Sequence, residues 1–379
     1  MIYEDTKIKE KGNYLILKNI HKKYDNFVAL NCLNLTLKNG EILVIVGPSG
    51  AGKTTILKII AGLEEITSGE VILKNKIIND LDPNVRKFAM VFETYALYPH
   101  ISVYDNLASS LSALKMDKEI IKEKVESISK LLQIFPLLDR RPNHLSGGQR
   151  QRVALGRALI KPADLYLLDE PIAHLDAKLR HQMIGEFAHL QESQKLSMIY
   201  VTHDWQEAIT LGDHIIVLKD GEIVQYGTKE EIFDRPADSF VGKIIGDPPM
   251  NLIPGNIITN SDGSFFKIDN IDNGKIKLND TLIDTLSSEK VSIGIRPHKI
   301  DLTTSIGDGI QAEIYSVERD GIDFLISIRV ADGIYKTRFN ERKSFKIGEK
   351  VWVKFNLKGA CLFDRKNKLI KVLEGKNGK

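Results

Sequence analysis

The sequence predicts an α/β fold with a largely parallel sheet, followed by a small β-rich, barrel-like domain. Three observations support this fold class. Short apolar runs alternate with longer helical patterns over the first two thirds of the 379 residues. One of these runs leads directly into a glycine-rich loop that opens a helix. After about residue 247 the helical patterns stop, and short segments of alternating polarity replace them.

Four apolar runs are the predicted strands of the parallel sheet. They lie at residues 42–46, 165–168, 197–201 and 214–218. Their length, and the helical patterns around them, are typical of strands buried on both faces by crossover helices. The stretch from about 94 to 160 is mostly helical and includes a charged, amphipathic segment, so we expect a helical subdomain there. The whole α/β domain is expected to span residues 1–247.

A β-rich C-terminal domain is predicted for residues 248–379. The segments DFLISIRV and VWVKFNL alternate with the period of two that puts every second side chain on one face of a strand. Their apolar positions are Phe324, Ile326, Ile328, Val330, Val351, Val353, Phe355 and Leu357. Segments of this kind at short spacing favour a small barrel.

Composition and charge argue against several classes of protein. The 53 basic and 50 acidic residues leave a net charge of +3, which does not indicate a nucleic-acid partner. Cys32 and Cys361 lack the spacing of a disulfide framework or a zinc site, which favours a reducing cytoplasm. The chain shows no apolar leader and no run of the roughly 18 apolar residues that a membrane span needs. Any membrane association is therefore expected to be peripheral.

The segment GPSGAGKT, residues 47–54, has the pattern of a phosphate-binding loop and stands where that loop must, between a strand and a helix. Its glycines let backbone amides curl around phosphates at a helix N-terminus that carries roughly half a positive charge. Lys53 is expected to reach the β and γ phosphates of ATP, and Thr54 to bind Mg²⁺. The predicted ATP-binding residues here are Gly47, Pro48, Ser49, Gly50, Ala51, Gly52, Lys53, Thr54 and Thr55.

Two acidic residues follow the predicted strand LYLL. Asp169 and Glu170 would lie at the C-terminal edge of the parallel sheet, where α/β folds bind ligands. We expect Asp169 to hold Mg²⁺, directly or through water, and Glu170 to polarise the water that attacks ATP. A solvated turn is the alternative for two adjacent acids, and the phosphate loop earlier in the chain argues against it.

The segment LSGGQRQRVALGRAL, residues 145–159, resembles the signature sequence of ABC ATPases in its residues and in its place before LYLLDE. Its start has the spacing of a capping box, and its glycines expose amides at a helix end, so a well-capped helix is the alternative. The resemblance implies that this helix end faces the γ-phosphate held by a partner subunit, and that two chains build two composite sites. The signature residues are Leu145, Ser146, Gly147, Gly148 and Gln149.

Three further residues match the ABC family by position. Tyr24 resembles the aromatic residue that stacks on adenine, although a lone tyrosine also serves packing. His203, in YVTHDWQEA, resembles the histidine that contacts the γ-phosphate and orients the attack. Asp176, in AHLD, resembles the aspartate of a loop that crosses the dimer interface.

One position departs from the family pattern. The segment VFETYALYPH resembles the one that carries a glutamine in the family, where it senses Mg²⁺ and links the ATPase to membrane subunits. Glu93 stands at that place. A glutamate keeps an oxygen ligand for Mg²⁺ beside the ATP, but it loses the amide donor and adds a negative charge. We expect hydrolysis to persist, with altered coupling or pH dependence.

The resemblance covers nearly the whole chain and is strongest to importer ATPases for maltose, other sugars and glycerol phosphate, through DGEIVQYGTKEEIFDRPAD, GDPPMNLIPG and GIRPHKIDL. It implies a homodimer or pseudo-dimer at the inner face of the cell membrane, joined to permease subunits and served indirectly by an extracytoplasmic solute-binding protein. No nucleic-acid partner is expected. Importers of polyamines, ferric iron, sulfate or molybdate have similar tails, so the solute stays open.

Two other classes of function are weaker alternatives. A soluble ABC ATPase of DNA repair or translation would be expected to carry a long coiled-coil insertion or a second cassette, and neither is visible. A regulatory binding module would not need Lys53, Glu170 and His203 together. We therefore expect an ATP hydrolase that drives solute uptake, with a C-terminal domain for dimerisation or regulation.

Overall fold

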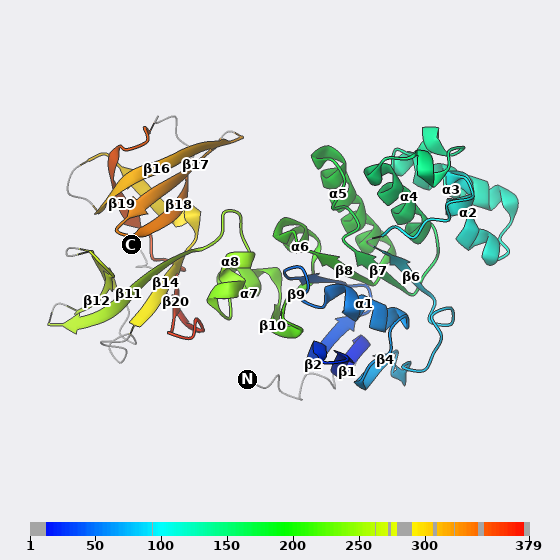
Figure 1. The fold of residues 1–379 in the computed structure, drawn as a ribbon, viewed down its shortest axis with the longest axis horizontal. Coiled ribbons are helices and arrows are strands. Elements are labelled where there is room, and N and C mark those ends of the chain that lie inside the picture. Colours follow the sequence, from blue (N-terminus) through cyan, green and yellow to red (C-terminus); the bar gives the residue numbers. More distant parts are fainter. Residues whose placement is uncertain are drawn as a thin grey trace. The chain divides into compact units, whose positions relative to one another are not determined.

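The structure, a computed structural model, divides into two compact units, Met1–Lys229 and Glu230–Lys379, each with its own apolar core. The first unit combines helices and strands, whereas the second is mainly strands (Figure 1). The described residues are 13–92, 94–261, 263–271, 274–278, 290–305, 309–321, 323–339 and 345–374. The predicted domain boundary near residue 247 stays a prediction.

A six-stranded sheet with the order β10-β9-β3-β8-β7-β6 forms the centre of the first unit. Its strands are β3 (Ile42–Val46), β6 (Phe88–Val91), β7 (Leu165–Asp169), β8 (Met198–Thr202), β9 (His214–Lys219) and β10 (Glu222–Gly227). All pair in parallel except β10, which runs antiparallel to β9. Every residue of β3, β7 and β8 is buried, as a parallel sheet with both faces covered requires. The four predicted strands are confirmed to within one residue at each end.

The strand ends of this sheet are level with one another. Val46 at the end of β3 pairs with Thr202 of β8, and Val201 pairs with Asp169 at the end of β7. The phosphate loop, the residue after β7 and the residue after β8 therefore leave the sheet at the same edge. This alignment brings motifs that are far apart in the sequence to one place.

Three helices follow the strands that carry these motifs. Helix α1 (Lys53–Ala61) follows β3 directly, and α5 (Ala177–Gln194) and α6 (Trp205–Leu211) follow β7 and β8. Both later helices begin at an aspartate, Asp176 or Asp204, whose carboxylate accepts hydrogen bonds from first-turn amides. The aspartate caps fix where the chain turns from each strand edge into its helix.

Helices α2 (Val103–Ala113), α3 (Lys118–Leu131) and α4 (Gly147–Leu159) lie between β6 and β7 in the chain, with short 3₁₀ turns at Phe135–Leu137 and Pro142–His144. Helix α2 packs against both α3 and α4. The residues of α2 and α3 that face inward repeat at helical spacing and include Leu107, Leu111, Ile121 and Val125. These helices occupy the stretch where helical patterns were expected.

The first unit also contains an antiparallel sheet that the sequence did not indicate. Its order is β2-β1-β4-β5, with β1 (Asn13–Tyr24), β2 (Phe27–Lys38), β4 (Ser68–Leu73) and β5 (Lys76–Ile77). The pairing of β1 with β2 shifts register four times along its length. Each shift moves the following side chains out of a period of two, which explains why the alternation is hard to recognise.

The second unit consists mainly of two antiparallel sheets. The first, of order β13-β12-β11-β14-β20-β21, contains β11 (Asn251–Asn260), β12 (Gly263–Ile268), β13 (Lys275–Leu278), β14 (Lys290–Ile295), β20 (Cys361–Phe363) and β21 (Leu369–Val372). The second, of order β15-β19-β16-β17-β18, contains β15 (Ile300–Thr303), β16 (Ile310–Asp320), β17 (Asp323–Val330), β18 (Gly333–Phe339) and β19 (Lys350–Phe355). Both sheets contribute to one apolar core, which includes most of the alternating positions singled out above. The β-rich C-terminal domain is thus confirmed.

Arg296, in the segment GIRPHKIDL, ties two short helices to the sheets of the second unit. These helices are α7 (Lys229–Asp234) and α8 (Ser239–Ile244). Arg296 is 4% exposed, and its guanidinium donates to the carbonyl oxygens of Phe233 (2.9 Å), Gly242 (2.9 Å) and Ile245. Burial lowers its pKa to about 10. One buried cation therefore satisfies three carbonyl groups around the helix ends.

Candidate functional site

The phosphate loop has the backbone that its glycines predict. Gly50 and Gly52 have φ angles of 80° and 102°, in the left-handed region that other residues adopt only with strain. A side chain at Gly47 would collide with the carbonyl oxygen of Leu218 in the neighbouring strand β9. At Gly52 a Cβ atom would lie 2.8 Å from the Leu30 side chain and 3.0 Å from the carbonyl oxygen of Ala29. The loop therefore needs glycine for conformation at Gly50, for space at Gly47, and for both at Gly52.

Lys53 begins helix α1 and lies across the phosphate loop. Its ammonium group donates to the carbonyl oxygens of Gly47 at 2.8 Å and Pro48 at 3.0 Å, and the residue is 7% exposed. The N-cap of α1 is Gly52, which has no side chain to accept from the first helical amides. A cation and a helix N-terminus thus meet at one loop, an arrangement suited to a polyphosphate.

Asp169 is the last residue of strand β7 and Glu170 follows it, at the sheet edge where the phosphate loop begins. Asp169 is 2% exposed. Glu170 has a φ of 46°, a left-handed conformation that costs a non-glycine residue about 1–2 kcal/mol. Its backbone N–H donates to the Val201 carbonyl oxygen at 3.0 Å. Strain of this kind, kept at a ligand-binding edge, is typical of functional residues.

His203 follows strand β8 and lies beside Glu170. Its Nδ1 is 3.1 Å from Glu170 Oε1. Behind this pair, the buried carboxylate of Glu207 accepts hydrogen bonds from the hydroxyls of Tyr200 (2.9 Å) and Thr202 (2.8 Å). Thr202 in turn accepts from the Asp204 amide at 2.9 Å. Glu207, which the sequence did not single out, therefore holds the turn that presents His203.

A second buried residue that the sequence did not single out is Gln151 of helix α4, 2% exposed. Its Nε2 donates to the carbonyl oxygen of Glu170, and its Oε1 accepts from the backbone N–H of His174, both at 3.0 Å. The partners of Gln151 lie 19 and 23 residues away in the sequence, so no local pattern reveals them. Gln151 joins the signature helix to the segment after β7.

The signature residues open helix α4, and the expected capping box is present. Ser146 Oγ accepts from the Gln149 amide at 3.3 Å, while Gln149 Oε1 accepts from the Ser146 amide at 2.9 Å. A Cβ atom at Gly147 would meet nothing within 4 Å, whereas one at Gly148 would lie 2.9 Å from the His174 carbonyl oxygen. Leu145 is 5% exposed and anchors this end of the helix.

Of the remaining predicted residues, Tyr24 lies near the start of α1. Its side chain interacts with those of Thr55 and Glu64, and the Lys22 ammonium lies 4.5 Å from the centre of its ring. Burial, followed by the Glu64 carboxylate, raises the pKa of Tyr24. Tyr24 is 38% exposed, which leaves it accessible to a base.

Asp176 caps helix α5, accepting from the Leu179 amide at 3.0 Å. The structure therefore gives Asp176 a local structural role, and its predicted role at a dimer interface stays a prediction. Glu93 lies outside the described residues.

The donor set at the sheet edge fits a magnesium ion bound with ATP. Thr54 is in the first turn of α1, and Asp169 ends β7, against which α1 packs. Magnesium in phosphoryl-transfer sites is held by one or two protein oxygens together with phosphates and water. A hydroxyl and a buried carboxylate supply oxygens of that kind.

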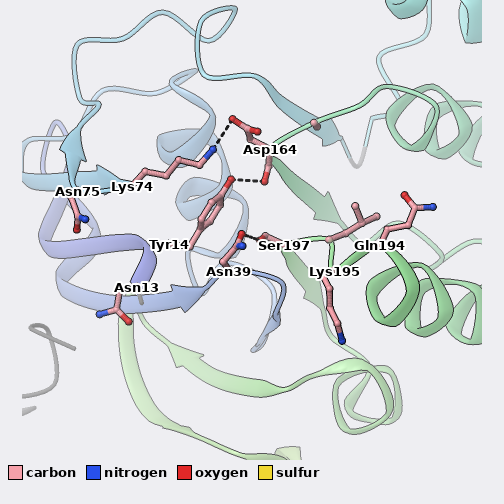
Figure 2. A pocket seen from close by; sticks show the side chains of 11 residues that line it. Asn13, Tyr14, Asn39, Lys74, Asn75, Asp164, Gln194, Lys195 and Ser197 are labelled. Carbon is pink, nitrogen blue, oxygen red and sulfur yellow. Dashed lines mark hydrogen bonds and ion pairs between the residues drawn. The ribbon is translucent and has the colours of Figure 1, made fainter. Parts of the chain in front are cut away.

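A polar cavity of about 520 Å³ lies at the opposite edge of the sheet (Figure 2). Asp164 and Ser197 in its lining directly precede β7 and β8, whereas the motifs described above follow these strands. The Tyr14 hydroxyl donates to the Asp164 carbonyl oxygen at 2.8 Å, and Lys74 pairs with the Asp164 carboxylate at 3.2 Å. The cavity is therefore separate from the candidate site.

These features together define a class of protein. A phosphate loop between β3 and α1, acidic residues at the end of a parallel strand, and a capped glycine-rich helix are the parts of an ATP-hydrolysing cassette. Comparison with known proteins then gives the family. The ABC transporter family matches residues 30–173, and the TOBE domain matches residues 293–363.

Relatives match almost the whole chain. The putative ABC transporter ATP-binding protein YcjV of Escherichia coli K12 is 38% identical over 361 residues, which is 94% of this chain and 98% of YcjV. The sn-glycerol-3-phosphate import protein UgpC of Bartonella bacilliformis is 42% identical, covering 88% of this chain and 93% of UgpC. The oligosaccharides import protein MsmX of Bacillus subtilis is 39% identical, covering 92% and 97%. The chain belongs to the ATP-binding proteins of ABC transporters, and it is an ATP hydrolase.

The fold is also similar to that of a solved ATP-binding cassette. A dimeric structure of the ATP-binding cassette MJ0796 with ADP and phosphate is 34% identical and covers 57% of this chain and 98% of its own, with a TM-score of 0.53. Within the described residues, no helix has the length and apolar character needed to cross a bilayer.

Proposed function

We propose that this chain energises an ABC importer for a sugar or related carbohydrate, working peripherally at the cytoplasmic face of the cell membrane. The names of UgpC and MsmX, which match this chain through the C-terminal unit as well as the cassette, support an import role for such solutes. The observation that carries the ATPase role is the convergence of Lys53, Glu170 and His203 at one edge of the parallel sheet.

In the proposed reaction the phosphate loop holds the ATP. Lys53 transfers hydrogen bonds from the loop carbonyls to the β and γ phosphates, and Tyr24 stacks on the adenine. Thr54 and Asp169, with Glu93, would hold Mg²⁺, which neutralises charge on the phosphates when bound. Glu170 accepts a proton from the attacking water, and His203, whose Nδ1 lies 3.1 Å from Glu170 Oε1, orients that water toward the γ-phosphate.

Two chains, or this chain and a related ATPase, are proposed to form the working dimer. The capped start of α4 presents Ser146 and the backbone amides of Gly147 and Gly148 to the ATP of the partner, because these amides lie at a helix N-terminus. Asp176 lies at the dimer interface. The dimeric state of the MJ0796 cassette supports this arrangement.

The remaining partners are proposed from the importer relationship. Permease subunits dock on the segment 95–100, in which Tyr98 is 48% exposed. An extracytoplasmic binding protein delivers the solute to the permeases and does not touch this chain. The β-rich second unit serves dimerisation or regulation, consistent with the TOBE domain at residues 293–363.

Replacement of Glu170 by glutamine tests this function. Because glutamine keeps the size but cannot accept the proton, turnover of the purified chain should fall about 10²–10⁴-fold while ATP binding persists. Size-exclusion chromatography with ATP should show an accumulated dimer. Glu192→Gln, an exposed residue of α5, is the matched control and should hydrolyse ATP at the wild-type rate. Normal turnover in Glu170→Gln would remove Glu170 from the proposed role.

The solute is tested on the binding protein. A ligand screen on the solute-binding protein encoded beside this chain should identify a sugar or a phosphorylated polyol. A polyamine, iron or oxyanion ligand would contradict the carbohydrate assignment and leave the ATPase role intact.

A further inference from the structure

We propose that Gln151 is a positioning residue for Glu170, and that its buried amide fixes the catalytic carboxylate to the signature helix. This inference rests on the proposed function, because it assumes that Glu170 activates water. It concerns a buried residue that acts through the backbone of the segment 170–174.

Both ends of the Gln151 amide are engaged on that segment. The donor Nε2 bonds the Glu170 carbonyl oxygen and the acceptor Oε1 bonds the His174 backbone N–H, each at 3.0 Å. Because Gln151 is 2% exposed, water does not compete for these bonds. A two-ended contact of this kind fixes the first and last residues of the segment relative to each other.

The conformation of Glu170 shows what the contact holds in place. Its φ of 46° is unfavourable for a residue with a side chain, so the peptide groups on both sides must be restrained. On one side, the Glu170 N–H bonds Val201 of the neighbouring strand at 3.0 Å. On the other side, the Glu170 carbonyl oxygen accepts from Gln151 Nε2 at 3.0 Å and, more weakly, from the Ala173 backbone N–H at 3.4 Å. The direction of the carboxylate toward His203, 3.1 Å away, depends on both restraints.

Helix α4 contacts the segment 170–174 at a second point. Gly148, one turn before Gln151, lies so close to the His174 carbonyl that a Cβ atom there would be 2.9 Å from the oxygen. The Ser146 hydroxyl caps the same helix. The signature residues and the segment that carries Glu170 are therefore joined by contacts within one chain, with Gln151 at their centre.

A cycle of variants in the full-length chain tests this role. Gln151→Met removes both hydrogen bonds at similar volume, and Gln151→Glu keeps the acceptor for His174 but turns a carboxylate oxygen toward the Glu170 carbonyl. Steady-state ATP hydrolysis, binding of a fluorescent ATP analogue and thermal unfolding are measured for each. We expect kcat to fall roughly 10- to 100-fold in both variants, with the dissociation constant of the analogue within about twofold of wild type.

The double variant Gln151→Met with Glu170→Gln separates positioning from general packing. If Gln151 acts through Glu170, the double variant should be no slower than Glu170→Gln alone, because the carboxylate that Gln151 positions is already absent. If kcat of the double variant falls below that of Glu170→Gln by the same factor as Gln151→Met lowers kcat of the wild type, the proposal is overturned.

Arg152→Met is the matched control on the same helix. Arg152 donates to the carbonyl oxygens of Leu132 and Gln133, at 3.3 and 3.4 Å, and does not touch the segment 170–174. The kcat of Arg152→Met should stay within about twofold of wild type, even if this variant unfolds at a lower temperature. Slow turnover in Glu170→Gln with normal turnover in both Gln151 variants would overturn the positioning role alone. Normal turnover in Glu170→Gln would overturn both proposals.

Discussion

Nδ1 of His203 lies 3.1 Å from Oε1 of Glu170, and the two residues follow neighbouring parallel strands whose ends are level. The imidazole is 63% exposed and the carboxylate 23%, so the histidine side of the pair faces outward. Each side chain restrains the other, and a group that binds between them meets a proton acceptor and a ring nitrogen together.

Removal of the imidazole should therefore impair turnover more than binding. His203→Ala is expected to lower kcat about 100-fold, because the attacking water loses the group that orients it, while ATP affinity changes little. A coupled phosphate-release assay measures this. His189→Ala, on the exposed face of α5, is the control and should match wild type. A His203→Ala enzyme with at least half of the wild-type kcat would contradict the role.

The conformation of Gly52 predicts a strong effect of one added methyl group. Gly52→Ala combines a φ of 102° with a contact of 2.8 Å to Leu30, so the loop must shift and ATP affinity should fall at least about tenfold. Gly185→Ala is the matched control, since a Cβ atom there meets nothing within 4 Å. It lies inside α5 and should stabilise the fold by about 0.5–1 kcal/mol without changing affinity. Isothermal calorimetry and thermal unfolding distinguish the two.

Glu207 predicts a pH dependence of stability. Burial raises the pKa of Glu207 above its ordinary value of 4.5, and the hydrogen bonds from Thr202 and Tyr200 offset part of that rise. Asp204 raises this pKa further and Arg180 lowers it. The folded state therefore favours protonated Glu207. The contribution of Glu207 to the free energy of unfolding is fully present below pH 4.5 and is lost as pH rises through the folded-state pKa.

Glu207→Gln removes this titration and keeps an acceptor for the two hydroxyls. From about pH 4 to about pH 8 the wild type should lose stability relative to the variant. Urea unfolding at several pH values measures the difference. A difference that is constant with pH, or that has the opposite sign, would contradict the assignment to Glu207.

The charge of Glu93 gives a prediction for activity. In the proposed site, replacing Glu93 by glutamine would remove a negative charge near the phosphates and supply the amide donor expected from the family resemblance. We expect hydrolysis in both proteins, with pH–rate profiles of different shape. Superimposable profiles would show that the extra charge has no effect on the reaction.

Arg296 should be essential for the stability of the second unit. Arg296→Met leaves the buried carbonyl oxygens of Phe233, Gly242 and Ile245 without their donor, which should cost about 3 kcal/mol. Chemical unfolding of the full chain, followed by a probe in the second unit, measures the loss. Arg365→Met, on an exposed turn, is the control. Equal stability of the two variants would show that the carbonyls find other partners.

The sequence predicts those parts of the site that are contiguous motifs or that directly follow a recognisable strand. The phosphate loop is contiguous, and its strand and helix are recognisable on either side. The acids after β7 and the histidine after β8 follow apolar runs, so their shared edge could be inferred from the rules of parallel sheets. These predictions depend on local pattern and on one general rule of topology.

The parts that escaped prediction depend on distant partners. Gln151 and Glu207 are polar residues in helices, and their sequence neighbourhood resembles that of any solvated position. Only the fold shows that they are 2% and 3% exposed and bonded to the segments that carry Glu170 and His203. The antiparallel sheet was missed for a different reason, because its register shifts interrupt the alternation of β1 and β2.

In the proposed dimer, the two roles of helix α4 determine how mutations in it should behave genetically. Its first turn serves the ATP of the partner, while Gln151, one turn later, holds the carboxylate of its own chain. A substitution that tilts this helix would damage both sites of a mixed dimer, although one chain is wild type. Such alleles should be dominant when expressed together with the normal gene, whereas lesions confined to one phosphate loop should spare the other site.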